Sequence, residues 1–179
     1  MKKENLFLYV LRLTVTLLLV AGIMAAALAG VNAITKDKIA AIKEQKVQAA
    51  IQAVLPNAQG LQPQPLTENA GIVKTCYASG ESYAVEVAPL GFDGAITMMV
   101  GIEDGKVTGI SIVSHTETPG LGAVAAADNA KGEAFRGQFV GGDGFTVGTN
   151  VDAMSGATIT SKAVTFGVNA ALEYVRSLG

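Results

Sequence analysis

Residues 96–113, ITMMVGIEDGKVTGISIV, decide the fold of this 179-residue chain. Apolar residues occupy alternate positions in the first half of the stretch: Ile96, Met98, Val100 and Ile102. Asp104-Gly105 is a strong turn signal, and residues 107–113 return with Ile110 and Ile112 on a common face. The stretch therefore predicts an antiparallel hairpin with one apolar face, and Met98 and Met99 are expected in the core.

Weaker strand patterns lie N-terminal to this hairpin, at residues 72–78 and 83–88, around a turn at 79–82. C-terminal to it, residues 123–137 are expected to be helical in part. Gly141 to Gly144 predict a turn before a short strand at 145–148.

A helix is predicted from about Thr160 to the chain end. Its apolar stripe consists of Val164, Val168, Ala171, Val175 and Leu178. Hairpins followed by helices predict an α+β domain in which an antiparallel sheet packs against helices.

The uncharged stretch from Leu13 to Thr35 predicts a membrane anchor, because its 23 residues exceed the ~20 that a transmembrane helix needs. A cleaved signal peptide is the alternative, although signal h-regions are typically shorter, about 7–15 residues. Residues 36–55 predict an amphipathic helix that either lies on a membrane or continues the anchor into a docking helix. Gly60 to Pro65 predict a linker or irregular loop.

These patterns divide the chain into three parts. Residues 1–35 are expected to form a cytoplasmic tip and anchor, residues 36–65 the juxtamembrane helix and linker, and residues 66–179 the folded domain.

Composition restricts the function. The chain carries 13 Lys and Arg against 15 Asp and Glu, which does not suit a nucleic-acid-binding protein. A mean hydropathy of +0.40 suggests that some apolar sequence lies in lipid. A single cysteine, Cys76, and a single histidine, His115, make a protein-ligated metal site improbable. Cys76 is expected to be a buried apolar residue.

The segment DAMSGATITS at residues 152–161 stands immediately before the last predicted helix and contains a glycine and several hydroxyl residues. This combination makes it the candidate ligand-binding segment of the chain. Ser155 can cap the helix, and Gly156 lets a ligand approach the backbone. The free N–H groups of the first turn and the helix dipole favour a phosphate. A plain helix cap rich in hydroxyl groups is the alternative interpretation.

Two motifs resemble signatures of the FMN-binding domain family. Asp-x-x-Ser-Gly-Ala-Thr, at 152–158, looks like the sequence at which a flavin transferase attaches FMN to a threonine through a phosphoester bond. Gly-Ile-Ser-Ile at 109–112, followed by His-Thr-Glu-Thr-Pro-Gly-Leu-Gly at 115–122, resembles the second signature. With the anchor in front, motif order and length are similar to the G subunits of the Rnf (Rsx) ion-translocating electron-transport complexes. The C subunits of the sodium-pumping NADH:quinone oxidoreductases share the motifs in a longer chain.

The resemblance implies that Thr158 carries covalent FMN and that Asp152 serves recognition by the transferase. It implies further cofactor contacts from the helix start, namely Ser155, Gly156, Ala157, Thr160 and Ser161. It also implies a second wall made by His115, Glu117, Thr118, Gly120, Leu121 and Gly122. A strand-end histidine satisfied by the backbone is the alternative for His115.

The implied function is an electron relay in a complex that couples electron transfer to Na⁺ or H⁺ export, with no complete activity in this chain by itself. Other membrane and redox subunits, the flavin transferase and the lipid bilayer are the implied partners. Nicotinamide is not expected to bind here, because no Gly-x-Gly-x-x-Gly follows a strand. A sodium-pump component, a standalone flavin carrier and a cofactor-free assembly module remain alternatives.

The implied location is the inner cell membrane, with the FMN domain on its extracytoplasmic side. Lysines and arginines flank the anchor on both sides, so their distribution does not decide its orientation.

Overall fold

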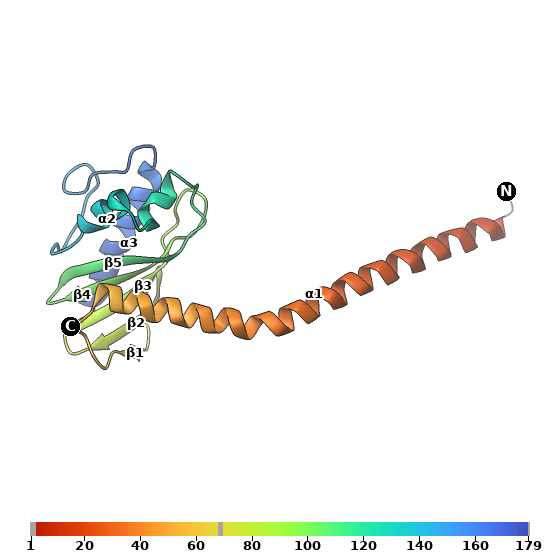
Figure 1. The fold of residues 1–179 in the computed structure, drawn as a ribbon, viewed down its shortest axis with the longest axis horizontal. Coiled ribbons are helices and arrows are strands. Elements are labelled where there is room, and N and C mark those ends of the chain that lie inside the picture. The colour runs from red at the N-terminus through yellow and green to blue at the C-terminus, as the bar shows by residue number, and fades with distance from the viewer. Residues whose placement is uncertain (1–2, 68–69, 179) are drawn as a thin grey trace. The chain divides into compact units, whose positions relative to one another are not determined.

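The computed structural model describes residues 3–67 and 70–178, with side chains from residue 7 onward. Five strands form one antiparallel sheet in chain order (Figure 1). They are β1 (Gln62–Gln64), β2 (Val73–Ser79), β3 (Ser82–Val87), β4 (Thr97–Glu103) and β5 (Lys106–Ser114). The predicted α+β fold is confirmed.

The β4–β5 hairpin forms as its sequence predicts. Asp104 and Gly105 both have positive φ, 51° and 72°, as a type I′ turn requires. The pairing places Val100 opposite Ile110 and Met98 opposite Ile112. This register keeps one apolar face continuous across the two strands.

Helices cover one face of the sheet (Figure 1). They are the 3-10 helix η1 (Gly122–Ala126), α2 (Ala130–Gly137) and α3 (Thr158–Arg176). The predicted stripe of α3 is buried at Val164, Val168 and Ala171, whereas Leu178 lies beyond the helix end and is exposed. Met98, Val100 and Ile102 supply the facing side of this core.

A smaller core covers the opposite face of the sheet. The helix α1 (Lys3–Val54) runs unbroken through the predicted anchor, and its last turns pack against Ala84 and Met99. A compact unit begins at Lys46, so these turns belong to the folded domain. The docking predicted as one possibility for residues 36–55 is seen in the last turns of α1, through Val47, Ala50, Ile51 and Val54.

By length and composition, α1 can cross a membrane between Phe7 and Val54. None of the side chains in its most apolar 18 residues is buried.

Two short segments differ from the sequence prediction. Residues 62–64 form β1 rather than an irregular loop, since an edge strand tolerates Pro63 without needing its missing N–H. Residues 145–148 form no strand. The side chain of Asn169 on α3 binds both the N–H and the C=O of Phe145, and the C=O of Thr146 accepts the N–H of Thr149 in a turn. Only an isolated bridge joins Val147 to Val151.

Candidate functional site

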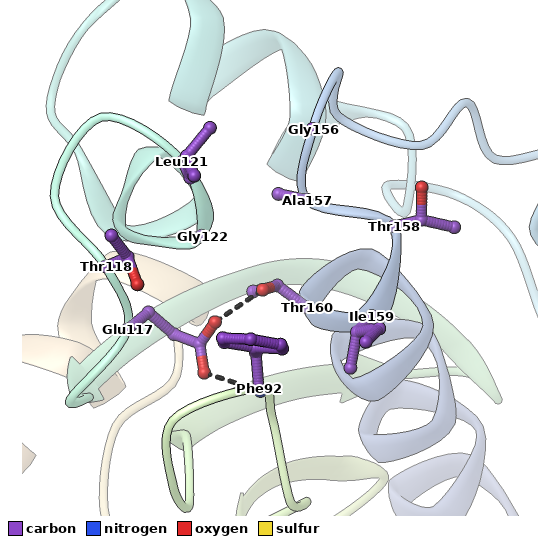
Figure 2. A pocket seen from close by; sticks show the side chains of 10 residues that line it. All are labelled: Phe92, Glu117, Thr118, Leu121, Gly122, Gly156, Ala157, Thr158, Ile159 and Thr160. Carbon is purple, nitrogen blue, oxygen red and sulfur yellow. Dashed lines mark hydrogen bonds between the residues drawn. The ribbon is translucent and has the colours of Figure 1, made fainter.

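A cavity of about 310 Å³ lies where three segments meet (Figure 2). These are the loop between β3 and β4, the loop after β5, and the start of α3. The lining residues are Phe92, Glu117, Thr118, Leu121, Gly122, Gly156, Ala157, Thr158, Ile159 and Thr160. The structure thus brings together the two motifs that the sequence singled out, although Glu117 and Thr160 are 43 positions apart.

The start of α3 is open to an anion. Ala157 occupies the N-cap position, and no side chain caps this end. The predicted capping role of Ser155 is therefore wrong, because the tight turn at Gly156, with φ of +73°, places Ser155 outside the helix. Without a side-chain cap, the N–H groups of the first turn and the helix dipole remain available to a negative ligand.

Thr158 is the first residue of α3 and its side chain is exposed. Figure 2 shows the side chain on the outer side of the helix start, pointing away from Glu117. The hydroxyl is therefore accessible to a modifying enzyme while remaining at the edge of the cavity.

Thr160 and Ser161 differ sharply from Thr158, since they are 2% and 0% exposed. Thr160 donates a hydrogen bond to Glu117. The Ser161 hydroxyl donates to the C=O of Ala157 and accepts the N–H of Met154. Ser161 lies outside the cavity lining and holds the loop that precedes α3.

A second contact holds the other end of that loop. The Gln138 side chain accepts the N–H of Asp152 at 2.7 Å and donates to its C=O at 3.3 Å. The side chains of Asp152 and Ser155 are themselves exposed. The loop from 152 to 157 is thus fixed through its backbone and displays its polar side chains.

Glu117 is the central polar group of the cavity wall, with only 5% of its surface exposed. One carboxylate oxygen accepts the backbone N–H groups of Phe92 at 2.8 Å and Asp93 at 3.2 Å. The other accepts the Thr160 hydroxyl at 2.5 Å (Figure 2). One side chain therefore joins all three segments that form the cavity.

Glycines make room for this carboxylate. A Cβ at Gly122 would collide with Glu117 and with the Thr160 hydroxyl, and a Cβ at Gly91 would collide with Glu117. At both positions the absent side chain is what lets the chain approach the carboxylate.

The remaining residues of the second motif do not all line the same cavity. Thr118 lines the cavity described above, and Leu121 lines both this cavity and a second one of about 550 Å³. Gly120, Asp152 and Ser155 line only the second. His115 follows β5 and lines neither, and its Nδ1 is buried with no hydrogen-bond partner within the described part of the chain.

The sequence reasoning missed Phe92 and Ile159. They are large apolar side chains at the cavity, exposed by 68% and 54%. The available signal for Phe92 was an aromatic residue in the glycine-rich loop 91–94. An open helix start beside apolar walls suits a phosphate ester joined to a planar aromatic ring, and the cavity volume lies within the range of ligand sites.

Comparison with known proteins agrees with this chemistry. The model of the FMN-binding domain family matches residues 91–173. The G subunit of the Na⁺-translocating ferredoxin:NAD⁺ oxidoreductase complex of Acetobacterium woodii is 34% identical over 192 aligned positions, which cover 94% of this chain and 93% of that protein. The G subunit of the ion-translocating oxidoreductase complex of Methanosarcina acetivorans is 30% identical, covering 92% and 93%.

A third relative matches more closely over a shorter region. The G subunit of the proton-translocating ferredoxin:NAD⁺ oxidoreductase complex of Clostridium ljungdahlii is 50% identical over 103 positions. That match covers 52% of this chain and 53% of the relative, about half the length of each.

Proposed function

Since this chain belongs to the family of G subunits of the ion-translocating oxidoreductase (Rnf) complexes and contains an FMN-binding domain, we propose that it carries FMN covalently on Thr158 and relays electrons within such a complex. The observation that supports attachment at Thr158 is its exposed hydroxyl at the uncapped start of α3, on the edge of the cavity. Thr160 and Ser161, the neighbouring hydroxyls of the motif, are buried and engaged.

Attachment requires a separate flavin transferase, because a threonine hydroxyl is a poor nucleophile at neutral pH without a base. With FAD as the donor, the Thr158 oxygen would bond to the flavin-side phosphorus, and the bond between the two phosphates would break. AMP would leave, and the hydroxyl proton would pass to the enzyme's base. Asp152, whose exposed side chain projects from the same fixed loop, is the residue we propose for recognition.

The chain's own residues supply binding and placement. The first-turn amides of α3 would hold the phosphodiester, which retains one negative charge. Phe92, Leu121 and Ile159 would shield an aromatic ring from water. Gly156 and Gly122 line the two walls of the cavity, and the positive φ of Gly156 forms the tight turn before α3. When bound, FMN supplies the reversible electron transfer, which no side chain here can perform.

We further propose that α1 anchors the domain in the inner membrane and that the domain lies on its extracytoplasmic side. The length and apolar composition of α1 support the anchor. Covalent attachment suits that location, because a tethered cofactor needs no supply of free FMN. The proposed partners are the other subunits of the complex, which exports Na⁺ or H⁺, together with the lipid bilayer.

Intact-protein mass spectrometry and in-gel flavin fluorescence test the attachment. The chain is produced with the transferase, as wild type, Thr158→Ala, and Thr149→Ala as a control at another exposed threonine. We expect FMN on the wild type and the control and none on Thr158→Ala. Flavin that persists on Thr160 or Ser161 contradicts the assignment, and a colourless wild type favours a cofactor-free assembly module.

Membership in the complex is tested by extraction in mild detergent and identification of the copurifying proteins. Recovery of the other subunits of a ferredoxin:NAD⁺ oxidoreductase supports the proposal. Recovery of sodium-pump components, or of the monomer alone, contradicts it.

A further inference from the structure

Glu117 is held as a buried acceptor. Its oxygens receive three hydrogen bonds, from two backbone amides and one hydroxyl, and every one of these bonds uses the carboxylate as the acceptor. The backbone N–H groups of Phe92 and Asp93 can only donate, so they suit the negative charge of a carboxylate at this position.

No cationic side chain of the described residues neutralises this charge. Within residues 3–67 and 70–178, no Lys, Arg or His lies within ion-pair distance of Glu117, whereas Arg136 pairs with Asp128 away from the cavity. The positive end of the α3 dipole, in whose first turn Thr160 lies, supplies partial compensation. The cavity wall thus keeps a net negative charge.

We propose that the buried charge of Glu117 lowers the redox potential of the flavin bound at Thr158. This inference rests on the proposed function. Glu117 and Thr158 line the same cavity, so an electron entering a ring bound there adds negative charge near an existing one. Water screens that repulsion poorly at a residue only 5% exposed, so the reduced flavin is destabilised relative to the oxidised one. The electron comes from another one-electron carrier of the complex, which is oxidised as the flavin is reduced.

Glu117 acts here through its charge. Its Oε1 accepts two backbone amides and its Oε2 accepts the Thr160 hydroxyl, so the protein holds the carboxylate in place at the cavity wall. This role adds to the cofactor contact that motif resemblance implies for it.

Two variants separate the charge from the hydrogen bonds. Glu117→Gln keeps a carbonyl that can accept the amides of Phe92 and Asp93, and its new N–H₂ can donate to Thr160, but the charge is gone. Thr160→Val keeps the charge and loses the hydroxyl bond. Glu173→Gln, an exposed acidic position near the other end of α3, is the control.

The flavin midpoint potential is measured by spectroelectrochemical titration of the full chain in detergent, and thermal unfolding checks each fold. We expect Glu117→Gln to shift the potential to more positive values. Thr160→Val and Glu173→Gln should produce no positive shift. If Glu117→Gln does not fold, the pair Glu117→Met/Thr160→Val removes charge and hydroxyl together and should show the same positive shift.

An unchanged potential in flavin-bearing Glu117→Gln overturns the inference, as does an equal positive shift in Thr160→Val. Absence of flavin from the wild-type chain overturns the proposed function instead, so the two failures are distinguishable.

Discussion

Three hydroxyl residues follow one another closely at the start of α3, and they differ in burial and in hydrogen bonding. Thr158 is exposed, Thr160 donates to Glu117, and Ser161 fixes the preceding loop. A similar division separates the polar residues of the 115–122 loop. Glu117 is enclosed by protein donors, whereas Thr118 faces the cavity.

Gly122→Val should disturb the site directly. Its new side chain would collide with Glu117 and Thr160, so we expect a loss of stability of about 1–3 kcal/mol, typical of overpacking. The visible absorption or potential of the flavin should change, or attachment should fail. Unfolding and flavin spectroscopy measure both effects.

Gly137→Ala is the matched control, because a Cβ there meets nothing within 4 Å. Gly120→Val also has open space but a φ of +77°, so its effect should come from backbone strain. If Gly120→Val and Gly122→Val both keep the stability and the flavin spectra of the wild type, the 115–122 loop is only a structural turn.

Cys76 should be chemically inert in the folded chain. It is 1% exposed, and burial raises the pKa of its thiol from 9.0 to about 11. At pH 8 a water-soluble maleimide should label it only after denaturation. Labelling of the native chain at the denatured rate would contradict its burial.

The same pKa shift predicts a pH effect on stability. Between pH 9 and 11 the unfolded thiol loses its proton while the folded one keeps it, so stability falls as pH rises. The loss should be on the order of 2–3 kcal/mol by pH 11. Denaturant unfolding compared with Cys76→Ala isolates this contribution from other titrating groups, and parallel pH profiles of the two chains would disprove it.

At the scale of elements, the end of α1 is locked to the sheet. Thr108 on β5 donates its hydroxyl to the C=O of Val54 at 2.6 Å, which satisfies a carbonyl that the helix end leaves open. Gly101 on β4 lies against the same carbonyl, and a Cβ there would be 2.6 Å from it. The small residue lets the helix end approach the strand.

Gly101→Ala should therefore destabilise the domain by about 1–3 kcal/mol, because the new Cβ would collide with the backbone carbonyl of Val54 and with the Thr108 hydroxyl that binds this carbonyl. Gly109→Ala is the control in the same place, since its Cβ would meet Val54 at ordinary contact distances of 3.5–3.8 Å. Chemical denaturation of the two variants measures the difference. Equal stabilities would mean that α1 does not dock as described.

At the scale of the whole molecule, we expect the domain to face the extracytoplasmic side. Asn57 follows α1 and is exposed, so Asn57→Cys in a Cys76→Ala background reports on sidedness. An impermeant thiol reagent should label it on intact cells, after removal of the outer membrane where the host has one. Labelling only after lysis would reverse the orientation.

The sequence alone determined the features that depend on local pattern. Alternation and an Asp-Gly turn specify the β4–β5 hairpin, a long uncharged stretch specifies the apolar helix α1, and an apolar stripe specifies α3. The 152–158 motif lies in one continuous segment and could be recognised for the same reason. Such signals arise from residues close together in the chain.

Only the tertiary structure decided which polar groups meet. Glu117 bonds Phe92 and Thr160, which lie 25 and 43 positions away, and no periodicity encodes such pairings. Ser155 lost its predicted cap role to a backbone turn, and β1 exists only because β2 offers it an edge. These outcomes depend on the meeting of distant segments, because a buried polar group must find its partner wherever the folded chain brings one.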